Sequence, residues 1–141
     1  FIHIIYLFFF PFYLFGSDSD KIVGIWLTAK GKSKIEIYKV NNFYHGKIIW
    51  LKDPNDENGK PKLDDKNPDV SLRTRPLLNL ELLKDLEFKK KGFWVNGRIY
   101  DPETGNVYKC KATMKNDNTL HFRGFIGFAL LGRTTVWTKV K

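Results

Sequence analysis

Apolar residues recur along this chain in short runs that turn-forming residues separate. In several runs they alternate with polar residues, as where Ile35 and Ile37 flank Glu36, and a period of two is typical of a strand with one buried face. The runs predict strands at residues 21–28, 34–40, 44–51, 93–100, 107–115, 119–125 and 133–139. Residues 77–88 allow two interpretations, because their leucine spacing fits a short helix while the run to Phe88 fits a strand.

Two turns allow the strand register to be predicted. The turn at 116–118 pairs Met114 with Leu120, Ala112 with Phe122 and Cys110 with Gly124. The turn at 101–105, with Pro102 early and Gly105 closing it, pairs Ile99 with Tyr108, Gly97 with Cys110 and Val95 with Ala112. These pairs share one apolar face across three strands, and a one-residue slip would expose that whole face. The opposite face carries Lys111, Thr113, His121 and Arg123.

These elements predict an all-β fold, a small antiparallel up-and-down barrel of about eight strands. A barrel of that size removes both sheet edges and encloses room for side chains or one small ligand; a two-sheet sandwich is the alternative. One long polar segment, residues 52–75, follows the third strand. Its carboxylates do not match the spacing of an EF-hand calcium loop, so we interpret it as a solvated loop that could form a lid over one barrel mouth.

The first fifteen residues are apolar or aromatic apart from His3 and Pro11, and none is charged. The run is shorter than the roughly 20 residues of a membrane-spanning helix and fits the apolar core of a secretory signal peptide. Ser17 and Ser19 are small residues suitably placed for a cut after Ser19. We therefore expect residues 1–19 to be a signal peptide lacking its start and residues 20–141 to be one exported domain, periplasmic or secreted. A retained anchor is the alternative.

Size, charge and cysteine content limit the classes of molecule that this protein is expected to bind. The chain has 141 residues, which is the size of one domain, and a net charge of +9. The basic run Lys89-Lys90-Lys91 beside Phe93 and Trp94 would suit nucleic-acid stacking, but expected export argues against that partner. The single cysteine, Cys110, excludes an intramolecular disulfide framework and a cysteine-rich zinc module. We expect a monomer that binds no metal, cofactor or nucleic acid.

Arginine is rare, with five residues against 19 lysines. Where lysine is the default base, an arginine can mark a position that needs a planar fork of donors. Arg73, Arg75 and Arg123 are therefore candidates for binding an anion or carboxylate. The alternative is structural, with these forks tying the loop and barrel ends to Asp69, Asp101 or backbone carbonyls.

No catalytic motif stands out. Cys110 and His121 fall on opposite faces of the predicted hairpin, out of the reach that a nucleophile and its base need. Tyr100 and Asp101 could act in hydrolysis, but Asp101 followed by Pro102 is more simply a turn. The tryptophans, Trp26, Trp50, Trp94 and Trp137, could line a cavity or fill the core.

Several motifs resemble known families. Gly24-Ile25-Trp26 resembles the Gly-x-Trp of lipocalins and related calycin barrels, in which an Arg or Lys from near the last strand packs over the Trp. Arg133 and Lys139 are the candidates here, and we assign the closing role to Trp26 with Arg133. A longer match spans residues 22–139 and includes, among others, Gly46-Lys47-Ile48-Ile49-Trp50-Leu51, Leu72-Arg73-Thr74-Arg75-Pro76-Leu77-Leu78, Ile99-Tyr100-Asp101-Pro102-Glu103-Thr104-Gly105 and Gly132-Arg133-Thr134-Thr135-Val136-Trp137.

These longer motifs resemble a secreted bacterial family catalogued as domain of unknown function 2147. Asn79 stands where that family usually has Gly. The resemblance implies a lipocalin-like barrel and export, and no reaction.

We expect an exported, non-enzymatic envelope protein that binds a small lipophilic or amphipathic anionic ligand at one barrel mouth. The predicted ligand residues are Trp50, Arg73, Arg75, Tyr100 and Arg123. Anionic envelope lipid or polysaccharide is a further expected partner, given the basic surface. The first alternative is an envelope interaction or stress-related structural protein with a filled barrel, and the second is a hydrolase.

Overall fold

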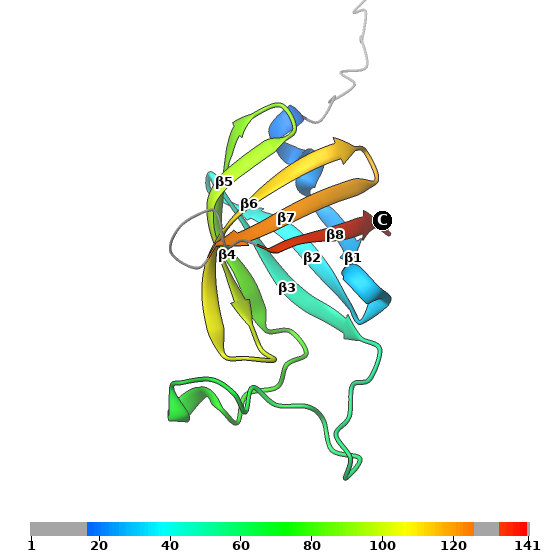
Figure 1. Cartoon of the computed structure of the whole chain (residues 1–141), viewed down its shortest axis with the longest axis vertical. Helices are drawn as coiled ribbons and strands as arrows, with labels where there is room; N and C mark the ends of the chain where they lie inside the picture. Colours follow the sequence, from blue (N-terminus) through cyan, green and yellow to red (C-terminus); the bar gives the residue numbers. More distant parts are fainter. Residues whose placement is uncertain (1–16, 126–132, 141) are drawn as a thin grey trace, which may run out of the picture.

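The computed structural model describes residues 17–125 and 133–140. Within them, eight antiparallel strands follow one another around a closed barrel, with the last strand paired to the first (Figure 1). The strands are β1 (Gly24–Leu27), β2 (Ser33–Val40), β3 (Phe43–Leu51), β4 (Glu81–Lys90), β5 (Phe93–Asp101), β6 (Asn106–Asn116), β7 (Thr119–Phe125) and β8 (Arg133–Lys139). Short 3₁₀ helices η1 (Asp18–Ile22), η2 (Ala29–Gly31) and η3 (Val70–Leu72) accompany them. The predicted eight-stranded barrel is confirmed, and residues 81–90 of the ambiguous segment are strand.

No helix in the described ranges is both long enough and apolar enough to cross a membrane.

The register of β6 and β7 is the predicted one, with Met114 opposite Leu120 and Ala112 opposite Phe122. Between β5 and β6 the prediction is right near the turn but wrong at Ala112, which faces Trp94 and not Val95. The reason is a bulge between Trp94 and Gly97, where Asn96 has a left-handed φ of 60°. The bulge directs Trp94 into the interior, where it is fully buried.

The barrel interior is filled by its own side chains. Trp26, Trp94 and Trp137 lie in one buried cluster with Tyr44, Phe122 and aliphatic residues from the surrounding strands. Gly97 lies where the core leaves no room for a side chain. A Cβ at this position would lie 2.7 Å from Leu86 Cδ1 and 2.9 Å from the Cys110 sulfur. Cys110 is a small buried hydrophobe here, and burial raises its pKa to about 12.

The N-terminal helix η1 closes one end of the barrel. The first strand was predicted to begin at Lys21, but residues 18–22 form η1 and β1 begins at Gly24. Ile22 enters the barrel end fully buried, and its carbonyl accepts a hydrogen bond from Trp26 Nε1 at 2.8 Å. Trp94 Nε1 donates to the Ser19 carbonyl at 3.1 Å, and the Tyr44 hydroxyl donates to the Asp20 carboxylate at 2.6 Å. Helical turns replace the predicted strand start because they present these acceptors to buried donors.

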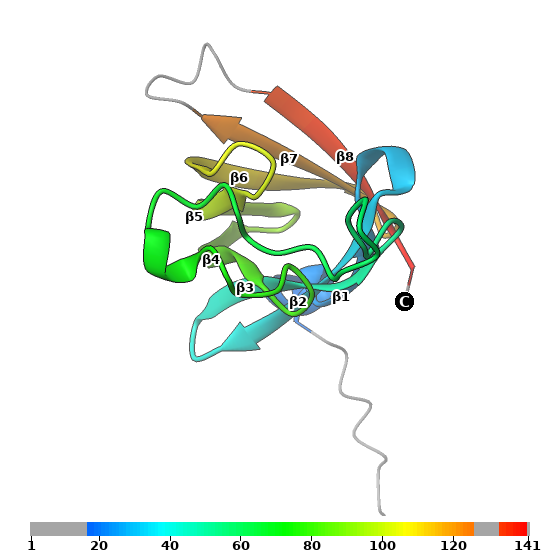
Figure 2. The same cartoon turned by 90° about the horizontal axis from the view of Figure 1, so that it is seen from below.

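The long connection between β3 and β4 lies at the other end. Figure 2 looks into this end, and the connection runs across it. Leu80 is buried, and its carbonyl accepts a hydrogen bond from Ile48 N at 2.9 Å. Asn79, with a φ of 71°, donates its backbone N–H to the Ile48 carbonyl at 2.7 Å. Asn tolerates left-handed backbone, so it can occupy this position of positive φ.

The connection is held by the β5–β6 turn. Gly105 is buried with a φ of 78°, and a Cβ on it would lie 2.1 Å from the Lys66 carbonyl oxygen. Backbone oxygen cannot rotate away, so a residue without a side chain is required at this contact.

We expect Gly105→Ala to lower the free energy of unfolding by about 2–4 kcal/mol, from the left-handed backbone strain and the overlap with Lys66. Urea denaturation and limited proteolysis within residues 52–80 measure the effect. Gly59→Ala is the matched control, since Gly59 also has a positive φ of 74° but its Cβ would meet nothing within 4 Å. Equal losses in the two variants would contradict the steric contact.

Candidate functional site

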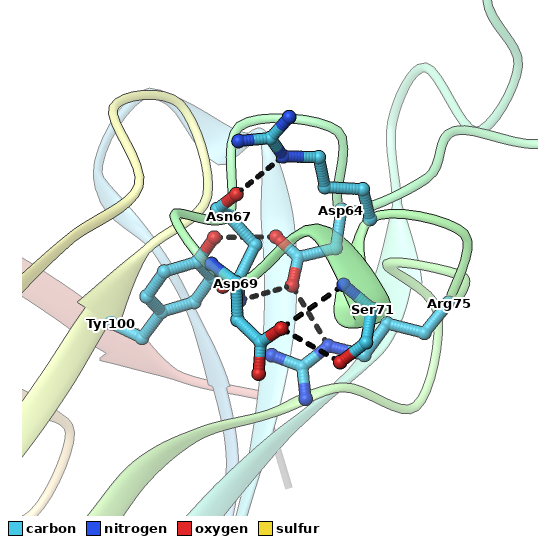
Figure 3. Close-up of polar contacts among 7 residues, drawn as sticks. Asp64, Asn67, Asp69, Ser71, Arg75 and Tyr100 are labelled. Carbon is cyan, nitrogen blue, oxygen red and sulfur yellow. Dashed lines mark hydrogen bonds and ion pairs between the residues drawn. The ribbon is translucent and has the colours of Figure 1, made fainter.

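Asp64 is the centre of a polar cluster on the long connection (Figure 3). Its carboxylate is fully buried and accepts three hydrogen bonds: from the Tyr100 hydroxyl at 2.5 Å, Arg75 Nε at 2.8 Å and Asn67 Nδ2 at 2.9 Å. We call Asp64, Asn67, Arg75 and Tyr100 the loop cluster. Because Tyr100 belongs to β5 and the other three to the connection, the cluster fastens the connection to the barrel.

Two neighbouring contacts extend the cluster. Arg73 Nε donates to the Asn67 carbonyl at 2.7 Å. Asp69 caps η3, accepting from the backbone N–H of Ser71 at 3.0 Å and from its hydroxyl at 2.7 Å.

The charges in the loop cluster favour structure over proton transfer. Burial acts to raise the pKa of Asp64, but the hydrogen bonds from Tyr100, Asn67 and Arg75 outweigh it and hold that pKa below its ordinary value. Burial, together with the hydrogen bond to Asp64, raises the pKa of Tyr100 to about 12. At neutral pH the pair is therefore a carboxylate and an intact phenol, and neither is suited to exchange a proton with a substrate.

Asp101, the other member of the hydrolase alternative, is engaged by its own turn. Its carboxylate accepts from the Glu103 N–H and the Thr104 hydroxyl, each at 3.0 Å. This is the turn role that the sequence favoured for it.

The structure brings only part of the predicted ligand set together. Arg73, Arg75 and Tyr100 meet at the loop end of the barrel, where Arg75 ties the loop as the structural alternative anticipated, although its acceptor is Asp64. Trp50 lies apart, with 39% of its surface exposed and Lys34 Nζ 4.9 Å from its ring centre. Arg123 lies on β7, its guanidinium carbon 5.9 Å from the Phe125 ring centre. Ligand binding by these five residues stays a prediction.

The cation over Trp26 is Lys139. The two residues are paired between β1 and β8, and Lys139 Nζ lies 5.4 Å from the indole centre and 3.4 Å from the Lys21 carbonyl. Arg133 pairs with Gly124 at the opposite end of β8, and its side chain lies outside the described residues. The closing role predicted for Arg133 stays a prediction, while Lys139, the second candidate, occupies the position over the ring.

A groove of about 540 Å³ lies on the outer wall of the barrel and is lined by residues of β4, β5, β6 and β7. We call it the basic groove; its lining residues are Lys89, Phe93, Val95, Asn96, Gly97, Arg98, Lys109, Cys110, Lys111 and Phe125. Lys111 Nζ lies 5.8 Å from the centre of the Phe93 ring and 5.4 Å from that of Phe125. Arg123, one of the predicted ligand residues, adjoins the groove through Phe125.

The basic groove joins apolar surface to positive charge. In the part of the chain that the structure describes, four of its lining residues are cations and none is acidic, although Arg98 also forms an ion pair with Asp85. Sequence reasoning found one corner of it, the lysine run beside Phe93, but missed Phe125 and Lys109. The predicted β6–β7 register contained the signal, because it placed Lys111 and Arg123 together on the outward face.

Among the described residues, no group of three or more His, Cys, Asp or Glu side chains is arranged to hold a metal ion.

A closed eight-stranded antiparallel barrel with consecutive strands paired defines this protein as a lipocalin-like barrel. Protein HP1028 from the human pathogen Helicobacter pylori, which belongs to the lipocalin family, is 24% identical to this chain with a TM-score of 0.75; the match covers 84% of this chain and 82% of that one. At that identity the likeness shows the fold. No curated protein matches the chain.

The chain belongs to the family described as "Uncharacterized protein conserved in bacteria (DUF2147)", whose sequence model matches residues 24–139. The family resemblance inferred from the motifs is therefore confirmed.

We expect Asp64→Asn to destabilise the protein by about 2–4 kcal/mol, because it weakens three hydrogen bonds to a buried carboxylate. The pKa of Asp64 is lowered on folding, so its contribution is complete above the ordinary carboxyl pKa and is lost as pH falls through the folded value. Urea denaturation as a function of acidic pH tests both points, and the variant is expected to lack this part of the pH dependence.

Asp65→Asn serves as the control, since it removes one exposed carboxylate from the adjacent position. If Asp65→Asn alters stability and its pH dependence as much as Asp64→Asn does, the loop cluster is not what holds the connection.

Proposed function

We propose that this protein is a non-enzymatic binding protein that holds an amphipathic anionic molecule in the basic groove. The observation that carries the proposal is that the apolar side chains of Phe93, Val95 and Phe125 line the groove together with Lys109 and Lys111, with no acid among the lining residues that the structure describes. A ligand with an acyl or aromatic body and one carboxylate, sulfate or phosphate matches that arrangement, since lysines attract its charge and aromatic rings its body. A volume of about 540 Å³ suits such a molecule.

The packing of the interior favours binding on the outer wall and not at the barrel mouth. Trp26, Trp94 and Trp137 occupy the inside, so an internal ligand would have to displace large side chains from a close-packed core. It would also have to pass either η1 or the loop cluster, both hydrogen-bonded to the barrel. A ligand in the basic groove requires neither change.

Export and an envelope location belong to the same proposal. Their support is the uncharged apolar run of residues 1–15 ahead of a domain with a net charge of +9. Such a domain would be attracted to anionic lipid or polysaccharide outside the cytoplasm.

A second candidate function is a structural or interaction protein without a small ligand, and the filled interior favours it. The two candidates differ in whether the basic groove takes up an amphiphile with useful affinity.

Titration with the anionic fluorophore anilinonaphthalene sulfonate separates the two. We expect saturable binding to the native protein, and about tenfold weaker binding to Lys109→Gln/Lys111→Gln, because each partly exposed cation contributes about 0.5–1 kcal/mol to holding an anionic aromatic ligand. Lys47→Gln is the control: Lys47 lies on β3 with its Nζ 5.6 Å from the Tyr38 ring centre, another lysine over an aromatic ring outside the basic groove.

Equal weakening by Lys47→Gln would contradict the basic groove as the site. Weakening by Arg73→Gln, with the groove variant unaffected, would return the site to the loop end of the barrel. Absence of saturable binding to the native protein would favour the structural candidate.

A further inference from the structure

Two hairpins at the η1 end of the barrel present exposed apolar side chains. Val40 and Phe43 flank the β2–β3 turn with 48% and 37% of their surfaces exposed, and Phe88 lies near the end of β4 with 37% exposed. The hairpins lie side by side, because one groove of about 390 Å³ is lined by Asn42 and Phe43 from the first and by Phe88 from the second. These residues form one apolar surface across two hairpins.

Charge accompanies the apolar residues. Lys89, Lys90 and Lys91 follow Phe88 directly and are exposed. Over the residues that the structure describes, none of these three lysines forms an ion pair with an acidic side chain. We call Val40, Phe43, Phe88, Lys89, Lys90 and Lys91 the tip surface.

Three acidic residues near the tip surface have partners of their own, whereas Asp117, in the β6–β7 turn at the same end, is exposed. Asp18 pairs with Lys21 at 3.5 Å, and Asp20 with Lys39 at 3.3 Å. Glu87, on β4 beside Phe88, accepts a hydrogen bond from Asn96 at 2.9 Å. Among the described residues Glu87 and Asp117 form no ion pair, but the three lysines of the run outnumber these two carboxylates.

We propose that the tip surface docks on an anionic phospholipid membrane. Exposed aromatic and aliphatic side chains beside lysines match the boundary between acyl chains and negatively charged headgroups. The chain enters the barrel at the same end: η1 begins at Asp18, immediately after the apolar run of residues 1–15.

The opposite end of the barrel is a poorer match. The connection across it also exposes apolar residues, Val70 most of all at 69%. Between residues 52 and 75 it carries six acidic and six basic residues, so it lacks the excess of positive charge that an anionic surface attracts.

Docking by the tip surface goes beyond the proposed ligand binding and shares only Lys89 with the basic groove. Lys89 and Phe93 line the basic groove next to the β4–β5 turn. Docking would therefore place this end of the groove near the lipid headgroups. An amphiphile could then enter from the bilayer.

Sedimentation of the full chain with vesicles tests the proposal. The vesicles are phosphatidylcholine alone or phosphatidylcholine mixed with phosphatidylglycerol. We expect the native protein to partition more strongly onto the anionic vesicles, and Lys89→Gln/Lys90→Gln/Lys91→Gln to reduce that partitioning by roughly a hundredfold, since each lysine near an anionic surface contributes about fivefold. Phe43→Ser is expected to reduce partitioning onto both kinds of vesicle by about tenfold.

Lys60→Gln/Lys62→Gln/Lys66→Gln is the matched control, because it removes the same charge from the connection at the other end of the barrel. Thermal unfolding by circular dichroism establishes that each variant is folded. The apolar run is present in every variant, so it cannot account for a difference among them.

Partitioning that is equal on the two vesicle types, or equally reduced by the control, would overturn docking by the tip surface. The Lys109→Gln/Lys111→Gln variant distinguishes the two proposals: unchanged partitioning onto vesicles with weaker fluorophore binding supports separate surfaces. Loss of fluorophore binding alone leaves membrane docking intact, and loss of docking alone leaves the groove intact.

Discussion

Trp26 and Trp94 are wholly buried, and each carries an N–H that must find a hydrogen-bond acceptor once water is excluded. Two carbonyls of η1 supply those acceptors, at Ile22 and Ser19. The helix can therefore close the barrel end over the indoles, and the interior can be dry and packed. In that state little space is left inside for a guest molecule, so the chemistry available for recognition lies on the wall and at the hairpin tips.

The two ends of the barrel are closed by different physical means. At the η1 end, neutral indole N–H groups meet backbone carbonyls, and these contacts carry no net charge. At the other end, the buried Asp64 carboxylate needs all three of its donors to offset its desolvation. Acid acts on the second closure through Asp64 itself. At the η1 end, the carboxylate in contact with the closure is Asp20, and the Tyr44 hydroxyl holds its pKa below its usual range.

The sequence was sufficient for the fold because alternation and turn chemistry are local signals. The β6–β7 register followed from one turn and one apolar face. The prediction paired Ala112 with Val95, whereas Trp94 takes that place, one residue away. The cause is the bulge at Asn96, which depends on interior packing and not on strand propensity. Likewise, nothing local in residues 18–22 indicates that buried indoles will draw them into a helical turn.

The candidate site was harder for the same reason. Arg75 was recognised as a structural or binding fork, yet its acceptor, Asp64, could not be chosen among many carboxylates in a segment without periodicity. The basic groove joins residues on four strands and next to a bulge, so Phe125 and Lys111 meet only in the folded barrel. The pattern of residues along the chain predicts which side chains share a face of the sheet. Which of those side chains contact one another depends on how the barrel packs.

The position of Ser19 bears on where the expected signal peptide could be cut. Its carbonyl accepts the Trp94 hydrogen bond, and Ser19 is also the last residue of the expected signal peptide. A cut after Ser19 would carry that acceptor away with the leader, remove the Ser17 carbonyl that binds the Asp20 N–H, and create a charged amino group at Asp20. A cut a few residues earlier would leave η1 whole. The position of such a cut would thus decide whether the barrel keeps both indole acceptors or must solvate one buried N–H.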